Sequence, residues 1–150
     1  MLFEANAPAL KRHFDYLEAE DGFRFEEAIL VEWIFSLYAK VLMLDVAARV
    51  WDNFFLEGEV FIYRTAVALL QIMEPSILNA PVEKVSRTLK HEIQHVEEIT
   101  LFSAIAKVEV PREIKHHVRS AEHAFYSPHF KTEIALARGP ANMSRSHTIN

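Results

Sequence analysis

The fold is decided by four blocks of sequence: Trp33-Ile-Phe-Ser-Leu-Tyr38, Arg49-Val-Trp-Asp52, Glu57-Gly58 and Phe61-Ile-Tyr-Arg64-Thr-Ala66. Two tryptophans, two arginines and an aspartate lie there within segments that are otherwise almost wholly apolar. Burying a charge is costly unless the charge is paired. These residues therefore predict one specified architecture rather than a generic hydrophobic core.

The composition around these blocks is that of a globular chain. Apolar residues make up 51% of the 150 residues and include eleven phenylalanines, which is enough for one domain with a real core. The absence of cysteine excludes disulfides and thiolate metal sites, and fits a reducing compartment. With only three glycines, the chain has no glycine-rich loop that could cradle a phosphate.

The sequence also bears on the compartment. The opening residues Met1-Leu-Phe-Glu4 soon meet a charge, so we expect no signal peptide. Charged residues interrupt the apolar runs before about 20 residues are reached, and we therefore predict no transmembrane segment. A cytoplasmic protein, with an option of peripheral attachment to endomembranes, is the expectation. The interrupting residues are Glu32, Lys40, Asp45 and Arg49.

Charge is spread unevenly along the chain. Residues 1–110 hold ten Lys or Arg against eighteen Asp or Glu, and residues 111–150 hold six against three. The acidic part argues against a nucleic-acid partner. We predict a helical domain over residues 1–126 and a mobile basic tail over 127–150, which contains Gly139-Pro140. A basic tail could contact an anionic membrane or partner, but we expect it to be a solvated end of the chain.

Hydrophobic periodicity predicts helices only, about seven of them packed as antiparallel neighbours, so the fold class is all-α. Asp45 is predicted to be the N-cap of the third helix and Gly58 its stop. The second and fourth helices are so apolar that each requires neighbours on more than one side. The predicted ranges are Pro8–Ala19, Phe25–Lys40, Asp45–Glu57, Glu59–Met73, Pro81–His95, Glu98–Val108 and Pro111–Phe125.

Taken in order, the blocks resemble the C-terminal half of a TBC domain, the helical domain of the Rab GTPase-activating proteins. Five elements carry the resemblance, which covers about residues 3–75: His13-Phe14 and the four blocks quoted above. One departure is visible, because members usually have a proline between the two tryptophan helices where this chain has Met43. That departure puts the rigidity of the turn in doubt, but not the fold.

The resemblance implies a partner, a Rab-type small GTPase of vesicle traffic, and a chemistry. TBC domains insert an arginine finger, which neutralises charge on the transferred phosphoryl group, and a glutamine finger, which orients the attacking water. The family carries them in Ile-x-x-Asp-x-x-Arg and Tyr-x-Gln motifs, upstream of the matched region. Neither motif occurs in these 150 residues. Losing a finger arginine costs on the order of 10³ to 10⁵ in rate, so we predict no activation of GTP hydrolysis by this chain alone.

The residues of the blocks are interpreted as structural. Trp33 and Trp51 are predicted to be core anchors. Asp52 is predicted to form a buried, charge-assisted bond with either Arg64 or Arg49. Gly58 is a helix stop. No residue is assigned a catalytic role, and no cofactor is predicted.

A candidate metal site has to be weighed against this. His91-Glu-Ile-Gln-His95 fits the zinc-hydrolase pattern of two histidines on one helix face, with Glu113, Glu122 or His123 as candidate third ligands. With eight histidines and seventeen glutamates in the chain, the match is weak. Two histidines that face solvent are the favoured interpretation, and no metal is predicted.

Two functions follow from the sequence. The first is a partial Rab GTPase-activating domain, either a truncation or a natural half-domain, that supports or binds a Rab and lacks the fingers. The second is a helical adaptor that pairs with itself or with another protein through an exposed apolar face.

Overall fold

The computed structural model describes residues 2–111. These residues form seven α-helices, one π-helical turn and one 3₁₀ turn, without a strand among them. The elements are α1 (Leu2–Asn6), α2 (Pro8–Asp21), the π turn η1 (Glu26–Leu30), α3 (Val31–Phe35), α4 (Leu44–Glu57), α5 (Glu59–Ile77), α6 (Val82–Lys90), the 3₁₀ turn η2 (Glu92–His95) and α7 (Glu98–Lys107). The all-α prediction is confirmed. The helix predicted over Pro111–Phe125 and the tail predicted over 127–150 lie outside the described residues.

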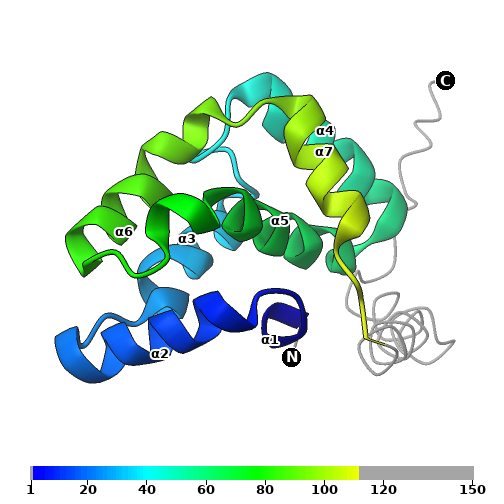
Figure 1. Cartoon of the computed structure of the whole chain (residues 1–150). Coiled ribbons are helices and arrows are strands. Elements are labelled where there is room, and N and C mark those ends of the chain that lie inside the picture. Colours follow the sequence, from blue (N-terminus) through cyan, green and yellow to red (C-terminus); the bar gives the residue numbers. More distant parts are fainter. Residues whose placement is uncertain (1, 112–150) are drawn as a thin grey trace, which may run out of the picture. The chain divides into compact units, whose positions relative to one another are not determined.

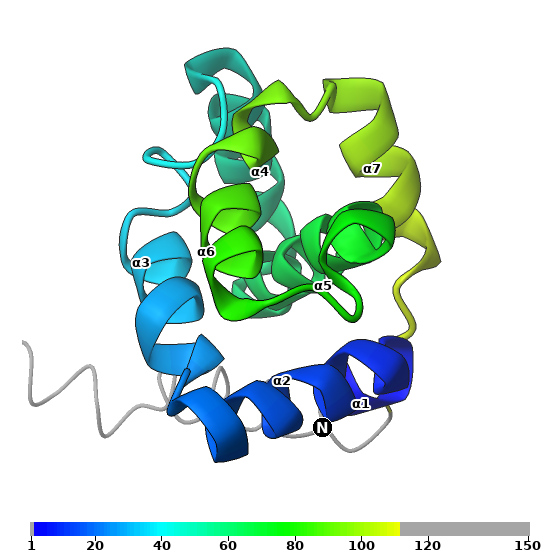
Figure 2. The ribbon, with the colours of Figure 1, turned by 60° about the vertical axis from the view of Figure 1, so that its left-hand side comes forward.

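Helix α5 is the centre of the packing. It contacts α1, α4, α6 and α7. Figures 1 and 2 show α1 and α2 on one side of it and α4 and α7 on the other. Six consecutive residues from Thr65 to Leu70 are all buried, which requires neighbours around the whole circumference of the helix. The predicted need of this helix for neighbours on more than one side is met within the described residues.

The same helix corrects one prediction. Helix α5 is 19 residues long, and its most apolar stretch of 18 residues has a mean hydropathy of 1.2, so it has the length and composition of a candidate membrane span. The expectation that charges interrupt every long apolar run overlooked this one, in which Arg64 is the one charged residue between Phe61 and Met73. Half of this 18-residue stretch is buried within the structure. The core helix of a globular domain can be as long and as apolar as a membrane span. The contacts of α5 with α1, α4, α6 and α7 identify it as a core helix.

The predicted second helix begins with a π turn. The amide of Val31 donates to the carbonyl of Glu26, five residues back, which widens the turn beyond 3.6 residues. Side chains that are four residues apart share a face in an α-helix and remain on one face through this turn. Phe25, Ile29 and Trp33 are all buried on that face. The apolar spacing of the sequence is thus served by a π turn rather than by a regular helix.

The C-terminal end of this helix was predicted wrongly. We expected it to continue to Lys40, but α3 ends at Phe35 because Leu37 and Tyr38 are left-handed, with φ of 46° and 65°. The Tyr38 amide donates to the carbonyl of Trp33 at 2.9 Å, and the Leu37 amide donates to Ile34 at 3.0 Å. This pair of bonds is a Schellman motif. Glycine usually takes the left-handed position, so no residue type here signals a stop.

The turn into α4 has the backbone that the family's proline would supply. Met43, the N-cap of α4, has φ −57° and ψ 144°, which is a conformation that proline prefers. The departure at Met43 therefore leaves the turn geometry intact. The prediction that Asp45 is the N-cap is wrong by two residues: Asp45 lies in the first turn of α4, where its Oδ1 accepts from the Val46 amide at 3.0 Å.

The predicted fifth helix is also shorter than expected. Pro81 precedes it as predicted, with an extended ψ of 159°, but α6 ends at Lys90. His91 leaves the helical region at φ −124°, and the chain continues as η2. This break lets Ile93 and Val96 turn back into the core. Tertiary burial therefore overrides helical continuation at this point.

Gly58 joins the two long helices α4 and α5, as the Glu57-Gly58 block predicted. It ends α4 and begins α5 with φ 79° and ψ −166°. This combination of angles is reached essentially by glycine alone. The direct connection between the two helices therefore depends on the absence of a side chain at this position.

We predict that Gly58→Ala lowers the free energy of unfolding by about 1–3 kcal/mol. The matched comparison is Gly22→Ala, because Gly22 has φ 67° and ψ 18°, a left-handed conformation that other residues adopt at lower cost, and a Cβ added there would meet open space. Urea unfolding of both variants measures the difference. A Gly58→Ala protein as stable as the Gly22→Ala protein would contradict this account of the joint.

Candidate functional site

The blocks that carried the resemblance converge on one junction between α3, α4 and α5. Trp33 is 1% exposed and lies in the core, and its ring is 6.3 Å from that of Tyr38. The Tyr38 hydroxyl is buried as well and donates to the Ile62 carbonyl of α5 at 2.6 Å. Burial raises the pKa of the Tyr38 phenol far above its ordinary value. The phenol therefore stays protonated and fastens the α3–α4 turn to α5.

Trp51 completes this junction from α4. Its indole Nε1 donates to the Leu37 carbonyl at 2.7 Å, so the left-handed turn is held from α4 as well as from α5. The ring, which was predicted to be a core anchor, is partly buried and packs against the core. A tryptophan with an apolar body and a satisfied N–H suits this half-buried position. The role of Leu37 was missed because a backbone carbonyl leaves no trace in a sequence.

Arg64 ties three helices together. Its side chain is 18% exposed, and one guanidinium nitrogen donates to Glu57 at 2.9 Å while the other donates to the Ile105 carbonyl of α7 at 2.9 Å. The guanidinium also lies 5.9 Å from the centre of the Phe61 ring. The predicted bond of Arg64 to Asp52 is thus replaced by bonds to Glu57 and to α7. An arginine held on so many sides is a structural tie.

Asp52 is exposed, which corrects the prediction that it forms a buried pair. Its carboxylate lies 3.6 Å from the guanidinium of Arg49, a pair in which both side chains are more than half exposed. Arg49 also reaches Glu98 on α7 at 3.3 Å. Exposed pairs of this kind contribute little to stability. The Arg49–Asp52 alternative of the prediction is present, but on the surface of α4.

Arg12 on α2 differs from these arginines. It is exposed and takes part in no ion pair among residues 2–111. It lines a shallow surface depression together with Tyr16 and Asn79. Beside it, His13 is buried and its Nε2 lies 3.1 Å from the Ala80 carbonyl, a distance at which a protonated Nε2 donates. The His13-Phe14 element therefore anchors α2 to the α5–α6 loop.

The structure does not assemble the zinc pattern. His91 lies past the end of α6 and His95 lies in η2, so the two do not share an α-helical face, and both are exposed. Within residues 2–111 no three His, Cys, Asp or Glu side chains come close enough to hold a metal ion. The candidate third ligands Glu113, Glu122 and His123 lie outside the described residues.

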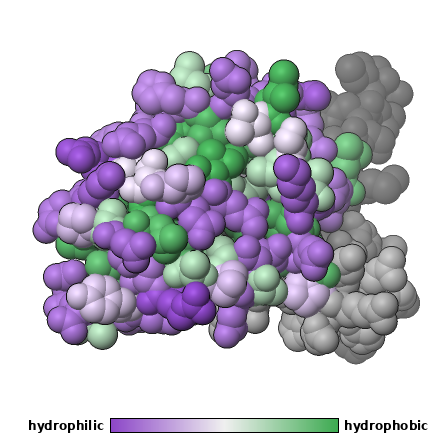
Figure 3. Space-filling model, viewed as in Figure 1, coloured by the Kyte–Doolittle hydropathy of each residue, from purple (hydrophilic) through white to green (hydrophobic). Residues whose placement is uncertain are grey.

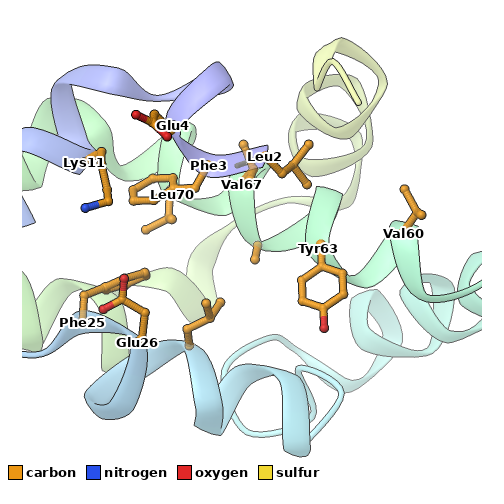
Figure 4. Close-up of a pocket in the computed structure, with 12 residues that line it drawn as sticks. Leu2, Phe3, Glu4, Lys11, Phe25, Glu26, Val60, Tyr63, Val67 and Leu70 are labelled. Carbon is orange, nitrogen blue, oxygen red and sulfur yellow. The ribbon is translucent and has the colours of Figure 1, made fainter. Parts of the chain in front are cut away.

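An apolar groove of about 340 Å³, which the sequence did not reveal, lies between α1, α2, η1 and α5. Figure 4 shows Phe3 and Leu70 at one end of it and Tyr63 at the other. Phe25 closes its floor, stacked on Phe14 at 4.3 Å between ring centres. In the sequence, the residues that line the groove are apolar positions of helices that are far apart in the chain. Their convergence is a tertiary property.

Charged side chains stand at the mouth of this groove. They are Glu4, Glu26 and Lys11. Lys11 bonds to Asp15, and this hydrogen bond, with smaller contributions from Glu26 and Glu4, raises the pKa of its amino group. The lysine is thereby held charged within an acidic surrounding. The groove thus combines apolar walls with three charged side chains among the residues that line it.

Large apolar side chains are also exposed elsewhere. Among residues 2–111 the most exposed are Phe35, Leu56, Ile99 and Phe55, each at least 79% exposed. Figure 3 shows apolar patches between polar residues on one face of the molecule. Contiguous apolar patches, as distinct from single exposed side chains, are typical of surfaces that contact other proteins. The described residues therefore present exposed apolar side chains and no assembled catalytic group.

Comparison with known proteins identifies the class. Residues 1–78 match the Rab-GTPase-TBC domain family. The chain is 34% identical over 110 residues to TBC1 domain family member 12 of Xenopus tropicalis, and 32% identical over 110 residues to member 14 of Homo sapiens. Each alignment covers 73% of this chain. Drainin of Dictyostelium discoideum is 44% identical over 77 residues, which is 51% of this chain.

The chain belongs to the Rab-GTPase-TBC domain family. Its aligned region spans 15–16% of the length of these relatives. The 110 aligned residues exceed the 78 residues of the family match, so the likeness to members 12 and 14 continues past Leu78 into the second half of the chain. The all-helical architecture and the order of the blocks agree with this membership.

We predict that Tyr38→Phe lowers the free energy of unfolding by about 1 kcal/mol at neutral pH, because one buried hydrogen bond is lost. Since burial raises the folded-state pKa of Tyr38, the folded protein keeps a proton that the unfolded chain releases above about pH 10. The wild-type protein therefore loses stability as pH rises above about 10. Urea unfolding at several pH values should show a shallower loss for Tyr38→Phe.

The matched control for this variant is Tyr16→Phe, because Tyr16 is 60% exposed. It should leave both the neutral-pH stability and the alkaline slope unchanged. An alkaline slope that is the same in Tyr38→Phe and in the wild type would refute the role given to the buried phenol.

Replacing Arg64 should lower the free energy of unfolding more than replacing Arg49. We predict that Arg64→Ala costs about 1–3 kcal/mol, because it removes the charged hydrogen bonds of a mostly buried guanidinium to Glu57 and to the Ile105 carbonyl. Arg49→Ala should cost less than about 0.5 kcal/mol, since its pairs are exposed. Thermal and urea unfolding measure both. Equal losses would mean that Arg64 is not the tie between α5 and α7.

Proposed function

We propose that this chain supplies the C-terminal part of a Rab GTPase-activating domain and that it supports, or offers one wall of, the site for a Rab-type GTPase. Membership of the family carries the proposal. The α3–α4–α5 junction supports this proposal. Tyr38, Trp51 and Arg64 bond to other helices and turns of this chain, so their role is to hold the domain together. The setting would be vesicle traffic, in the cytoplasm or on the surface of endomembranes.

We further propose that the chain alone does not accelerate GTP hydrolysis. The family's arginine and glutamine finger motifs do not occur in the sequence. Arg64 is held between Glu57 and the Ile105 carbonyl, and Arg49 is paired with Asp52 and Glu98 at the surface of α4. A finger has to project unpaired toward the transferred phosphoryl group.

The proposal is tested by single-turnover GTP hydrolysis with a panel of Rab proteins and the chain in excess. The expected result is no acceleration of hydrolysis, together with retention of at least one Rab in a pull-down. Arg12→Ala is the informative variant, because Arg12 is exposed and without an ion pair among the described residues. Strong acceleration on any Rab would overturn the claim of inactivity, and Arg12→Ala, Arg49→Ala and Arg64→Ala would then show which arginine is responsible.

A second candidate function rests on the exposed apolar side chains. Phe35, Phe55, Leu56 and Ile99 would suit an adaptor that associates with itself or with another protein. Light scattering across a range of concentrations separates the two candidates. A stable homodimer that retains no Rab would favour the adaptor, whereas a monomer that retains a Rab favours the partial GTPase-activating domain.

A further inference from the structure

The surface depression that Arg12 lines lies between α2 and the loop that joins α5 to α6. Its volume is about 810 Å³, which is within the size range of binding sites in proteins. The buried ring of His13 on α2 lies 3.1 Å from the Ala80 carbonyl of the loop, so a hydrogen bond ties the two walls together. A site that is preformed in this way loses little conformational freedom when a partner binds.

Two opposite charges line this depression without ion-pair partners. Arg12 is the one arginine among residues 2–111 that forms no ion pair, although acidic side chains outnumber basic ones there. No ion pair involves Asp21 in the described part of the chain. Asp21 is the last residue of α2, where the helix dipole disfavours a negative charge. The stability of α2 therefore does not explain why an aspartate occupies this position.

The spacing of the two charges sets the length of a partner that reaches both. Arg12 and Asp21 belong to the same helix, which spans Pro8–Asp21. Since an α-helix rises about 1.5 Å per residue, their α-carbons lie about 13 Å apart along the axis of α2. An extended chain rises about 3.3 Å per residue and covers this distance in about four residues.

The lining of the depression favours an extended segment over a helix. Tyr16, which is 60% exposed, and Asn79 contribute a hydroxyl and an amide to it, beside the apolar side chains of Leu17 and Leu78. An extended segment carries backbone N–H and C=O groups that such polar side chains can bond, whereas the backbone of a helix is bonded within itself. Tyrosine is also enriched where proteins bind one another.

We propose that this depression binds an extended segment of another protein, which carries an acidic residue and a basic residue about four positions apart. The acidic residue pairs with Arg12. The basic residue pairs with Asp21, where it also relieves the unfavourable charge at the end of α2. The residues between them lie against Tyr16 and Leu17. This binding requires neither a Rab nor GTP, so it goes beyond the function proposed above and is tested without them.

The test uses the full chain and an array of short peptides, each with one glutamate and one arginine at i and i+4, in either order, and with varied uncharged residues elsewhere. Fluorescence anisotropy with the best-retained peptide, labelled with fluorescein, measures Kd. We expect saturable binding, and a Kd that rises at least about fivefold in Arg12→Glu and in Asp21→Arg. The same peptide with both charges replaced by glutamine should bind more weakly. Failure of every peptide in the array to bind would overturn the proposal.

Exchanging the charges gives the sharper measurement. The double variant Arg12→Glu/Asp21→Arg should regain binding when the glutamate and the arginine of the peptide are exchanged, which a merely structural role of these residues would not produce. Arg49→Glu and Glu59→Lys change the charge of exposed residues that do not line the depression, and should shift Kd by less than about twofold. Circular dichroism checks that all variants fold. An unchanged Kd in both single variants, or no recovery in the double variant, would refute this pairing.

Discussion

A buried phenol hydroxyl needs a hydrogen-bond acceptor within the protein, and the packing of α3, α4 and α5 depends on the acceptor that Tyr38 uses. Its hydroxyl reaches the Ile62 carbonyl at 2.6 Å only because the chain turns left-handed at Leu37 and Tyr38. Each left-handed residue costs about 1–2 kcal/mol. Burial of the Tyr38 ring, the Schellman bonds to α3 and the Trp51 bond to the Leu37 carbonyl offset that cost. One turn thereby fixes α3, α4 and α5 against one another.

This junction explains why the charged residues of the blocks divide into two kinds. Arg64 lies where α4, α5 and α7 meet, and its two terminal guanidinium nitrogens bond to Glu57 and to the Ile105 carbonyl. Arg49 and Asp52 lie one turn apart on α4 and face solvent. The surface that remains is acidic with apolar patches, and it contains the groove beside α5. Such a surface suits the binding of a partner better than the chemistry of a nucleotide.

The fold class and most of the helices could be predicted because apolar spacing and punctuation by glycine and proline are local signals. Gly58 and Pro81 marked true boundaries. The errors fall where a local signal was missing or was overridden. No glycine announced the stop after Phe35, because Leu37 and Tyr38 accept a strained backbone that tertiary contacts stabilise. The break after Lys90 has the same origin, since burial of Ile93 decides it.

By itself, the sequence determined that the chain is helical, that it belongs with the TBC domains and that Trp33 is part of its core. Those properties follow from residue types and spacings, which are present before folding. Only the tertiary structure decided that Asp52 is exposed, that Arg64 bonds to α7 and that Phe3, Phe25 and Leu70 meet around an apolar groove. Contacts between residues that are far apart in the sequence depend on how the helices pack. Packing is set by the shape of the whole core rather than by any local sequence pattern.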